Sequence, residues 1–134
     1  MVKPYSQLIE INDELDVVRA TMEARRLARL IGFKETEQYQ ISTATSELAT
    51  NIYRYANKGK IILRIIKGEI RRGIEVIAED QGPGIKDIQR ALQEGFSTSK
   101  SLGIGLPGVK RLMDDFDIKS ENGKGTRVTV RKWV

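Results

Sequence analysis

Residues 79–85 read EDQGPGI, and residues 101–112 read SLGIGLPGVKRL. In the first stretch a predicted strand ends at a carboxylate, Asp80, and the chain then turns over two glycines around a proline. In the second stretch a glycine-rich turn opens a predicted helix that has Pro107 in its first turn. Glycine-rich turns are common, so each stretch taken alone is also compatible with an ordinary connecting loop. The rest of the chain decides between these two interpretations.

The composition is typical of one folded domain. The 134 residues are 40% hydrophobic and 31% charged, which suits one core and is too short for two. We therefore expect a single domain over residues 1–134. The sequence has no apolar run long enough to cross a membrane, no secretion signal and no cysteines for disulfides or zinc sites. These features favour a cytoplasmic protein.

Basic and acidic residues are interspersed along almost the whole chain. There are 23 basic and 18 acidic residues, for a net charge of +5. This interleaving is more typical of a solvated surface than of a nucleic-acid-binding patch, so DNA or RNA binding is the less favoured alternative. An acidic protein partner is compatible with the same charge. The chain has no histidine, which excludes a phosphohistidine and the most common general base.

Hydrophobic periodicity predicts the element order β-α-α-β-β-α-α-β-β. The predicted strands are residues 5–11, 59–68, 71–80, 116–121 and 126–134, and the predicted helices are residues 14–31, 35–56, 87–95 and about 107–115. The predicted apolar stripe of the second helix consists of Ile41, Ala44, Leu48, Ile52 and Tyr55. Because the order is neither strictly alternating nor all-parallel, we expect an α+β fold. Its helices would pack on one face of a mixed, mostly antiparallel sheet, in two layers.

Two polar side chains are predicted on the face of the sheet that the helices cover. Ile74, Val76, Ala78 and Asp80 share one face of their strand, because side chains alternate with a period of two. A carboxylate at the end of a buried stripe costs free energy unless it has hydrogen-bond donors. Asp80 therefore either caps the following turn or accepts a hydrogen bond from a ligand, such as a purine amine. Thr126 would face the same side, either as a simple strand former or as a second polar group in one pocket.

The second predicted helix carries an acid and an amide at the border of its apolar stripe. Glu47 and Asn51 are four residues apart and so lie on one side of the helix. Such a pair is merely exposed in most helices. At the rim of a cleft, however, the amide oxygen can ligate Mg²⁺ and the carboxylate can accept a hydroxyl proton. The glycines in residues 103–108 precede a helix whose unbonded N–H groups attract phosphate, although they match neither the Walker-A nor the Rossmann pattern.

Four segments, taken in order, resemble the motifs of the GHKL nucleotide-binding family, which includes gyrase-type ATPases, Hsp90 and histidine kinases. The segments are SELATNIYRYA (46–56), EDQGPG (79–84), SLGIGLPG (101–108) and GKGT (123–126). They are similar to the family's N box, its two glycine boxes and its final Gly-Thr motif. The resemblance runs from about residue 40 to the C-terminus. It implies the Bergerat-type two-layer fold and an ATP site with a very short lid over residues 95–102.

The resemblance also implies roles for individual residues. Glu47 matches the catalytic base and Asn51 the Mg²⁺ ligand, so the implied cofactors are ATP and Mg²⁺. Asp80 matches the residue that binds the adenine amino group, and Thr126 lies at the same end. The other implied cofactor-binding residues are Gly82, Gly84, Ile85, Lys100, Gly103, Gly105, Leu106 and Gly108. For Lys100, a solvated position in the lid is the alternative.

Within the family, the resemblance favours the serine/threonine kinases that act on a separate protein. The chain carries no acceptor histidine and no predicted second domain. The segments NIYRYA (51–56), GFSTS (95–99) and GLPGVKRLMD (105–114) resemble the switch kinases of the stressosome more than anti-sigma factor kinases. Such kinases phosphorylate STAS-domain scaffold proteins and then activate a PP2C-type phosphatase upstream of a stress sigma factor. The alternatives are a sigma-sequestering anti-sigma factor kinase and a non-catalytic ATP-gated binding module.

The first predicted helix carries a second apolar strip away from its core side. This strip consists of Leu15, Val18, Met22 and Leu30 and is intermixed with Arg19, Arg25, Arg26 and Arg29; the docking face that it would form includes Leu15, Arg19, Met22, Arg26 and Leu30. An apolar strip edged with arginine is suited to docking an acidic partner protein. Alternatively, the N-terminal strand covers part of it.

Overall fold

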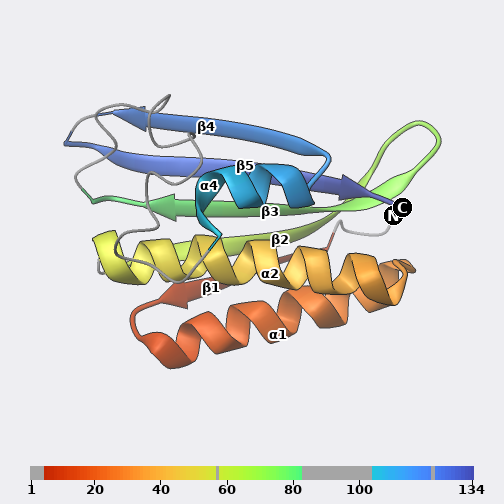
Figure 1. Cartoon of the computed structure of the whole chain (residues 1–134), viewed down its shortest axis with the longest axis horizontal. Helices are drawn as coiled ribbons and strands as arrows, with labels where there is room; N and C mark the ends of the chain where they lie inside the picture. The colour runs from red at the N-terminus through yellow and green to blue at the C-terminus, as the bar shows by residue number, and fades with distance from the viewer. Residues whose placement is uncertain (1–4, 57, 83–103, 122) are drawn as a thin grey trace.

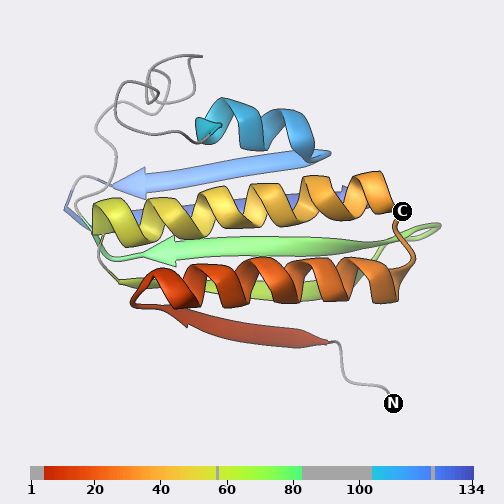
Figure 2. The same ribbon diagram turned by 60° about the horizontal axis from the view of Figure 1, so that its bottom comes forward.

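The structure is a computed structural model and describes residues 5–56, 58–82, 104–121 and 123–134. In these ranges, three α-helices and a π-helical turn pack on one face of a five-stranded sheet (Figures 1 and 2). The strands are β1 (Ser6–Ile11), β2 (Gly59–Lys67), β3 (Arg72–Asp80), β4 (Asp115–Glu121) and β5 (Gly125–Trp133), and the helical elements are α1 (Glu14–Ile31), α2 (Glu35–Asn51), the π-helical turn Ile52–Ala56 and α4 (Gly105–Leu112). The expected α+β class is confirmed.

The sheet has the strand order β1-β2-β3-β5-β4. Every pairing among the described strands is antiparallel, so this part of the chain lacks the parallel pairs that a mixed sheet would contain. The consecutive strands β2 and β3 pair with each other, as do β4 and β5, and β1 forms one edge of the sheet. The helix predicted over residues 87–95 lies outside the described residues.

Helix α1 has the bounds that the sequence predicts, because both of its ends carry strong signals. At the N-terminus, Asp13 accepts a hydrogen bond from the backbone of Asp16 at 3.0 Å, and the Asp16 carboxylate accepts one from the backbone of Asp13 at 3.3 Å. This reciprocal pair is a capping box. At the C-terminus, Gly32 adopts a φ of 110° and donates its N–H to the carbonyl of Ala28 at 3.2 Å.

The core lies between the helices and the inner face of the sheet. Its fully buried side chains include Ala20, Ala24, Leu27, Ile41, Ala44, Ile61, Leu63, Ile74, Val76, Val109 and Val130. Removing this apolar surface from water is the main stabilising contribution to such a fold. None of the helices formed by the described residues combines the length and apolarity needed to cross a membrane.

Two predictions about the helices are wrong. The second helical segment reaches Ala56 as predicted, but its α-helical part, α2, ends at Asn51, and Tyr55, which the periodicity places on the apolar stripe, is 54% exposed. The chain changes there to a wider π-helical turn, which rotates the following residues. As a result Tyr53, rather than Tyr55, packs against the core.

The second wrong prediction concerns the last helix, which the periodicity extends to Asp115, whereas α4 ends at Leu112. Met113 already has an extended backbone, with φ of −110° and ψ of 160°. The next N–H, that of Asp114, donates to the carbonyl of Arg131 in β5 at 2.9 Å. The chain therefore leaves the helix and joins the sheet earlier than the apolar periodicity indicates.

The outer face of the sheet, which no described helix covers, is protected by charged side chains. Glu75 on β3 forms ion pairs with Arg64 on β2 at 2.9 Å and with Arg131 on β5 at 2.6 Å. Long arginine side chains can cover apolar surface with their aliphatic stems. Accordingly Ile77, on the same outer face, is only 3% exposed.

Candidate functional site

Asp80 lies at the end of β3, between two neighbouring strands. Its directly paired residues are Gly59 on β2 and Thr126 on β5. Its Oδ1 accepts a hydrogen bond from the backbone N–H of Gly82 at 2.9 Å. No other described residue bonds to this carboxylate, so its second oxygen has no partner within the described part of the chain. The capping role and the ligand-binding role expected for Asp80 are therefore compatible with each other.

Two glycines allow the backbone to approach the end of β3 from both sides. A Cβ atom on Gly125 would lie 2.1 Å from the carbonyl oxygen of Asp80, and Gly125 also has a φ of 101°. A Cβ atom on Gly59 would lie 2.4 Å from the carbonyl oxygen of Glu79. Real Cβ atoms do not approach a carbonyl oxygen so closely, so both positions require glycine. Sequence reasoning missed Gly59, because its importance depends on the register of the β2–β3 hairpin.

The Thr126 hydroxyl is positioned by a second hydroxyl that the sequence analysis did not single out. Its Oγ1 lies 2.9 Å from the Oγ of Ser120 on β4. The Ser120 hydroxyl in turn donates to the carbonyl of Gly125 at 3.2 Å. A hydrogen-bonded pair of hydroxyls thus stands beside Asp80. The sequence around Thr126 (TRVTV, residues 126–130) gives no signal for Ser120, because the partner of Thr126 is known only from the pairing of β4 with β5.

A cleft of about 810 Å³ opens at this end of the sheet. Its lining includes Ala56, Gly59, Asp80, Gln81, Ser120, Gly125 and Thr126, together with the basic residues Lys58, Lys60, Lys119, Lys124 and Arg127. The acidic residues Glu10, Glu79 and Glu121 also line the cleft, so the charge of its lining is mixed. Among the described residues, Glu47, Asn51 and Leu106 do not contribute to this lining, so they stand at a second part of the candidate site.

That second part is built around Glu47 on α2. The residue is buried, with 7% of its surface exposed, deeper than the rim position expected from the sequence. Its Oε1 accepts a hydrogen bond from the backbone N–H of Ile104 at 2.8 Å. Ile104 immediately precedes Gly105, which begins α4 with a φ of 69°. A single carboxylate therefore connects α2 to the glycine-rich turn before α4.

Asn51 is the last residue of α2 and lies one helical turn after Glu47. The π-helical turn that follows it packs against the chain beyond β3, since a Cβ atom on Gly82 would lie 2.8 Å from the Cβ of Ala56. Both views show the ends of α2 and β3 on the same side of the molecule (Figures 1 and 2). Mg²⁺ is usually held by one or two side-chain oxygens together with substrate phosphates, and a half-buried amide at this point fits that need.

Helix α4 is fixed near both of its ends. At the start, Leu106 is buried, and a Cβ atom on Gly108 would lie 2.5 Å from the Cβ of Ile104. Gly108, expected to bind the cofactor, therefore has a packing function: it leaves room for Ile104. At the other end, the Nζ of the buried Lys132 donates to the carbonyl of Leu112 at 2.8 Å, which satisfies one of the last carbonyls of the helix.

The structure thus groups the described candidate residues in two places. Asp80, Gly82 and Thr126 lie at the end of β3, whereas Glu47 lies against the chain that leads into Gly105 and Leu106. Asn51 is the last residue of α2, one helical turn after Glu47. The other candidate residues, Gly84, Ile85, Lys100 and Gly103, lie outside the described residues.

Two features together define a class of protein. The carboxylate of Asp80 lies at a strand end beside the Gly125-Thr126 turn, and the carboxylate of Glu47 is hydrogen-bonded to the start of the glycine-rich helix α4. The chain belongs to the histidine kinase-like ATPase domain family, whose model matches residues 11–132. Its relatives include the serine/threonine-protein kinase RsbT of Bacillus subtilis (strain 168), which is 48% identical over 126 residues, or 94% of this chain and 95% of that protein.

Anti-sigma F factors are also similar to the chain. That of Thermoanaerobacter sp. (strain X514) is 38% identical over 140 residues, covering 97% of this chain and 96% of that protein. That of Caldanaerobacter subterraneus subsp. tengcongensis is 38% identical over 100 residues, covering 70% and 68%. The predicted resemblance to the GHKL family, and within it to a serine/threonine kinase of the RsbT type, is confirmed by the family match and by the identity to RsbT.

Proposed function

We propose that the chain is an ATP-dependent serine/threonine protein kinase, formed by a single domain over residues 1–134. The observation that carries this proposal is the hydrogen bond between Glu47 and Ile104 at 2.8 Å. It brings the proposed base to the turn where helix-start N–H groups favour phosphate. The similarity to the kinase RsbT supports the same activity.

In this proposal the cleft at the end of β3 holds the adenine. The second carboxylate oxygen of Asp80 accepts a hydrogen bond from the adenine amino group, while the first remains bonded to Gly82. The Thr126 hydroxyl, held by Ser120, contacts the same end of the base. Gly59 and Gly125 support this arrangement, because they allow the neighbouring strands to approach the backbone on each side of Asp80.

The reaction would be an in-line transfer of the γ-phosphoryl group. The acceptor serine or threonine oxygen forms a bond to the γ-phosphorus, the bond from that phosphorus to the β–γ bridging oxygen breaks, and ADP leaves. Glu47 takes the hydroxyl proton. Mg²⁺, ligated by Asn51 and the phosphates, would neutralise negative charge on the nucleotide. Positioning and charge neutralisation supply most of the acceleration in such transfers.

The proposed protein substrates are STAS-domain scaffold proteins of a stressosome, and the proposed partner after release is the regulatory domain of a PP2C-type phosphatase. Both fit a cytoplasmic kinase of the RsbT type. We further propose α1 as the docking face for these partners. Its residues Leu15, Met22 and Leu30 are 57%, 67% and 64% exposed, so β1 does not cover them.

The charges on this face are partly engaged within the chain. Arg19 lies 3.6 Å from Asp16, and Arg26 forms an ion pair with Glu23. A groove of about 850 Å³ between β1 and α1 is lined by Arg19, Met22 and Arg26, among others. An acidic partner would therefore compete with Asp16 and Glu23 for these arginines, which is suited to reversible docking.

One experiment tests the proposed function directly. The chain is incubated with Mg·ATP and purified candidate STAS-domain proteins, and any phosphosite is mapped by mass spectrometry. We expect phosphorylation of a serine or threonine that disappears with Glu47→Gln. Binding of ATP without phosphorylation of any candidate would favour a non-catalytic ATP-gated module.

The similarity to anti-sigma F factors favours one second candidate, a kinase whose main activity is to sequester a sigma factor. A pull-down with purified sigma factors and STAS-domain proteins separates the two. Capture of a sigma factor in preference to the STAS-domain proteins would support the second candidate and contradict the first.

A further inference from the structure

The contact between Glu47 and Ile104 assigns a second role to the proposed base. We propose that the two residues form one positioning unit, in which the Ile104 amide orients the Glu47 carboxylate and the carboxylate in turn holds the start of α4. The inference rests on the proposed kinase function, because it concerns the same site. It predicts that nucleotide binding and proton transfer depend on the same side chain through different oxygens.

The carboxylate geometry supports separate functions for its two oxygens. Oε1 accepts the Ile104 N–H at 2.8 Å, a typical distance for a hydrogen bond to a charged acceptor. A carboxylate that is 7% exposed requires such a donor, since burial without one is costly. The bond restricts the rotation of the carboxylate. Oε2 is then held in one orientation, from which it can accept the substrate proton.

Gly108 leaves the space that Ile104 occupies at the start of α4. These residues are four apart, and a Cβ atom on Gly108 would lie 2.5 Å from the Cβ of Ile104. A side chain at position 108 would therefore displace Ile104, so glycine at this position leaves the Ile104 amide free to reach Glu47. The Ile104 side chain itself is 38% exposed, so a shorter side chain at this position leaves the amide in place.

The two ends of this unit have different functions in the proposed reaction: Glu47 accepts the proton, and Ile104 leads into the phosphate-binding turn. Glu47 lies on α2, one turn before the proposed Mg²⁺ ligand Asn51. Ile104 leads into Gly105 and Leu106, where the phosphates are expected. Loss of the bond would leave the Ile104 N–H without its acceptor and displace the start of α4. Nucleotide affinity should therefore fall even though Glu47 touches no part of the adenine cleft.

Two substitutions at Glu47 separate the roles. Glu47→Gln keeps a side-chain oxygen that can accept the Ile104 N–H, but it cannot take a proton. Glu47→Ala removes both functions. We expect Glu47→Gln to bind Mg·ADP within about threefold of the wild type and to lose about 10²- to 10⁴-fold in turnover. We expect Glu47→Ala to lose a similar amount in turnover and also to bind Mg·ADP about tenfold more weakly or worse.

The donor can be removed as well. Ile104 has a φ of −82°, close to the value that proline imposes, so Ile104→Pro removes the N–H with little change in the backbone angle. Ile104→Val is the matched control, because it shortens the side chain and keeps the donor. Ile104→Pro should lower turnover at saturating ATP at least about tenfold relative to Ile104→Val, since Glu47 is no longer oriented.

The experiment combines calorimetry with Mg·ADP, turnover on a purified STAS-domain protein and thermal unfolding of each variant. The proposal is supported if Glu47→Gln and Glu47→Ala differ in ADP affinity while both lose turnover. Equal ADP affinity of Glu47→Ala and the wild type would overturn it, as would equal turnover of Ile104→Pro and Ile104→Val. If the wild type itself binds no ADP, the proposed function fails, and this inference fails with it. If Glu47→Ala does not fold, the comparison of turnover between Ile104→Pro and Ile104→Val tests the proposal instead.

Discussion

Asp80 and Thr126 are directly opposite each other on the neighbouring strands β3 and β5. The pairing places a carboxylate and a hydroxyl side by side on the inner face of the sheet, although the two residues are far apart in the sequence. The Gly125 backbone, which admits no side chain, lies against the Asp80 carbonyl. The strand pairing thus assembles the proposed adenine end of the site.

Replacing Asp80 tests its proposed contact with adenine. Asp80→Asn keeps an oxygen that can accept the Gly82 N–H, but its uncharged amide binds the adenine amine more weakly. We expect ATP affinity to fall about tenfold to a hundredfold, measured by calorimetry. Asp117→Asn is the control, since Asp117 is an exposed carboxylate on β4 that does not line the cleft. Equal ATP affinity of both variants would contradict the assignment.

Two glycines in the β4–β5 turn should differ sharply in their tolerance of alanine. Gly123 has a φ of 83°, and a Cβ atom there would meet no described atom within 4 Å, whereas a Cβ atom on Gly125 would meet Asp80 at 2.1 Å. Gly123→Ala should cost about 1 kcal/mol from backbone strain alone. Gly125→Ala adds a clash with the backbone and should cost more than about 2 kcal/mol. Denaturant unfolding measures both, and similar losses would show that the close approach at Gly125 is relaxed in solution.

Lys132 should stabilise the fold by satisfying the end of α4. It is buried, with 8% of its surface exposed, and its Nζ donates to the Leu112 carbonyl at 2.8 Å. Lys132→Met keeps the aliphatic volume and leaves the carbonyl without this donor, which should lower the free energy of unfolding by about 1–3 kcal/mol. The exposed Lys124 forms an ion pair with Glu121 at 3.4 Å, so Lys124→Met should change stability by less than about 0.5 kcal/mol. A neutral Lys132→Met would contradict the capping role.

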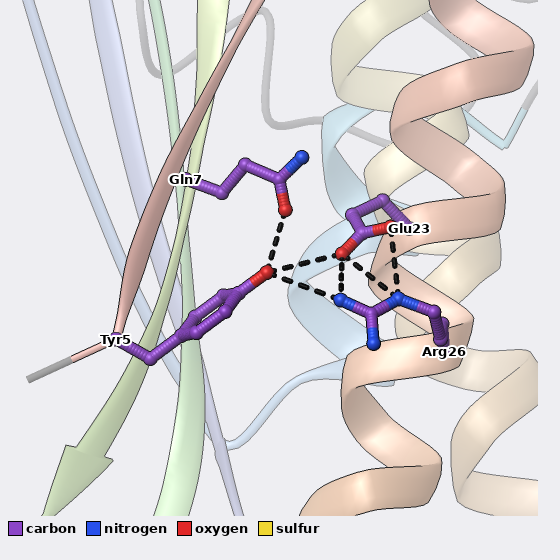
Figure 3. A network of polar contacts seen from close by, with 4 residues as sticks. All are labelled: Tyr5, Gln7, Glu23 and Arg26. Atoms are coloured by element: carbon purple, nitrogen blue, oxygen red, sulfur yellow. Dashed lines mark hydrogen bonds and ion pairs between the residues drawn. The ribbon is translucent and has the colours of Figure 1, made fainter.

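A polar network joins the N-terminal strand region to α1 (Figure 3). The Tyr5 hydroxyl lies 2.6 Å from Gln7 Oε1 and 3.1 Å from Glu23 Oε1, and it accepts a hydrogen bond from Arg26 at 3.2 Å. The hydrogen bond from Arg26 holds the pKa of Glu23 below its ordinary value of about 4.5. Burial, followed by the hydrogen bond to Glu23, raises the pKa of Tyr5 above 10.0.

The lowered pKa of Glu23 predicts an acid-dependent contribution to stability. Because the folded-state pKa lies below that of the unfolded chain, the contribution is present above about pH 4.5 and is lost as the pH falls through the folded-state pKa. The wild type should therefore be more stable than Glu23→Gln at about pH 6–7, and the difference should shrink in acid. Thermal unfolding of both proteins across this range is the measurement. A difference that stays constant down to acid pH would show that the network does not favour the charged carboxylate.

The sequence predicts best where local signals agree. The bounds of α1 follow from its apolar periodicity and from Gly32, and strands β2, β3 and β5 follow from their runs of apolar residues. Periodicity misplaces Tyr55 because it assumes an α-helical turn, and the π-helical turn after Asn51 breaks that assumption. It misplaces the end of α4 because Met113 already has an extended backbone and Asp114 is hydrogen-bonded to β5.

The candidate site likewise has residues that the sequence identifies and supporting contacts that it does not. Asp80, Thr126, Glu47 and Asn51 are recognisable because each lies in a motif with a fixed residue order. Their supporting contacts depend instead on tertiary register: Ser120 is found only from the β4–β5 pairing, and Gly59 only from the β2–β3 pairing. The bond from Ile104 to Glu47 joins residues 57 positions apart, and no local pattern indicates it.

The central claim is that four separated segments surround one magnesium-bound adenine nucleotide. Hydrogen–deuterium exchange with and without Mg·ADP tests it most directly, because it reports on the backbone of each segment in the same sample. We predict that Mg·ADP slows exchange in residues 46–56, 79–84, 101–108 and 123–126 together, and leaves the exposed side of α1 unchanged. Unchanged exchange in all four segments at saturating Mg·ADP, or slowing confined to one of them, would contradict the claim.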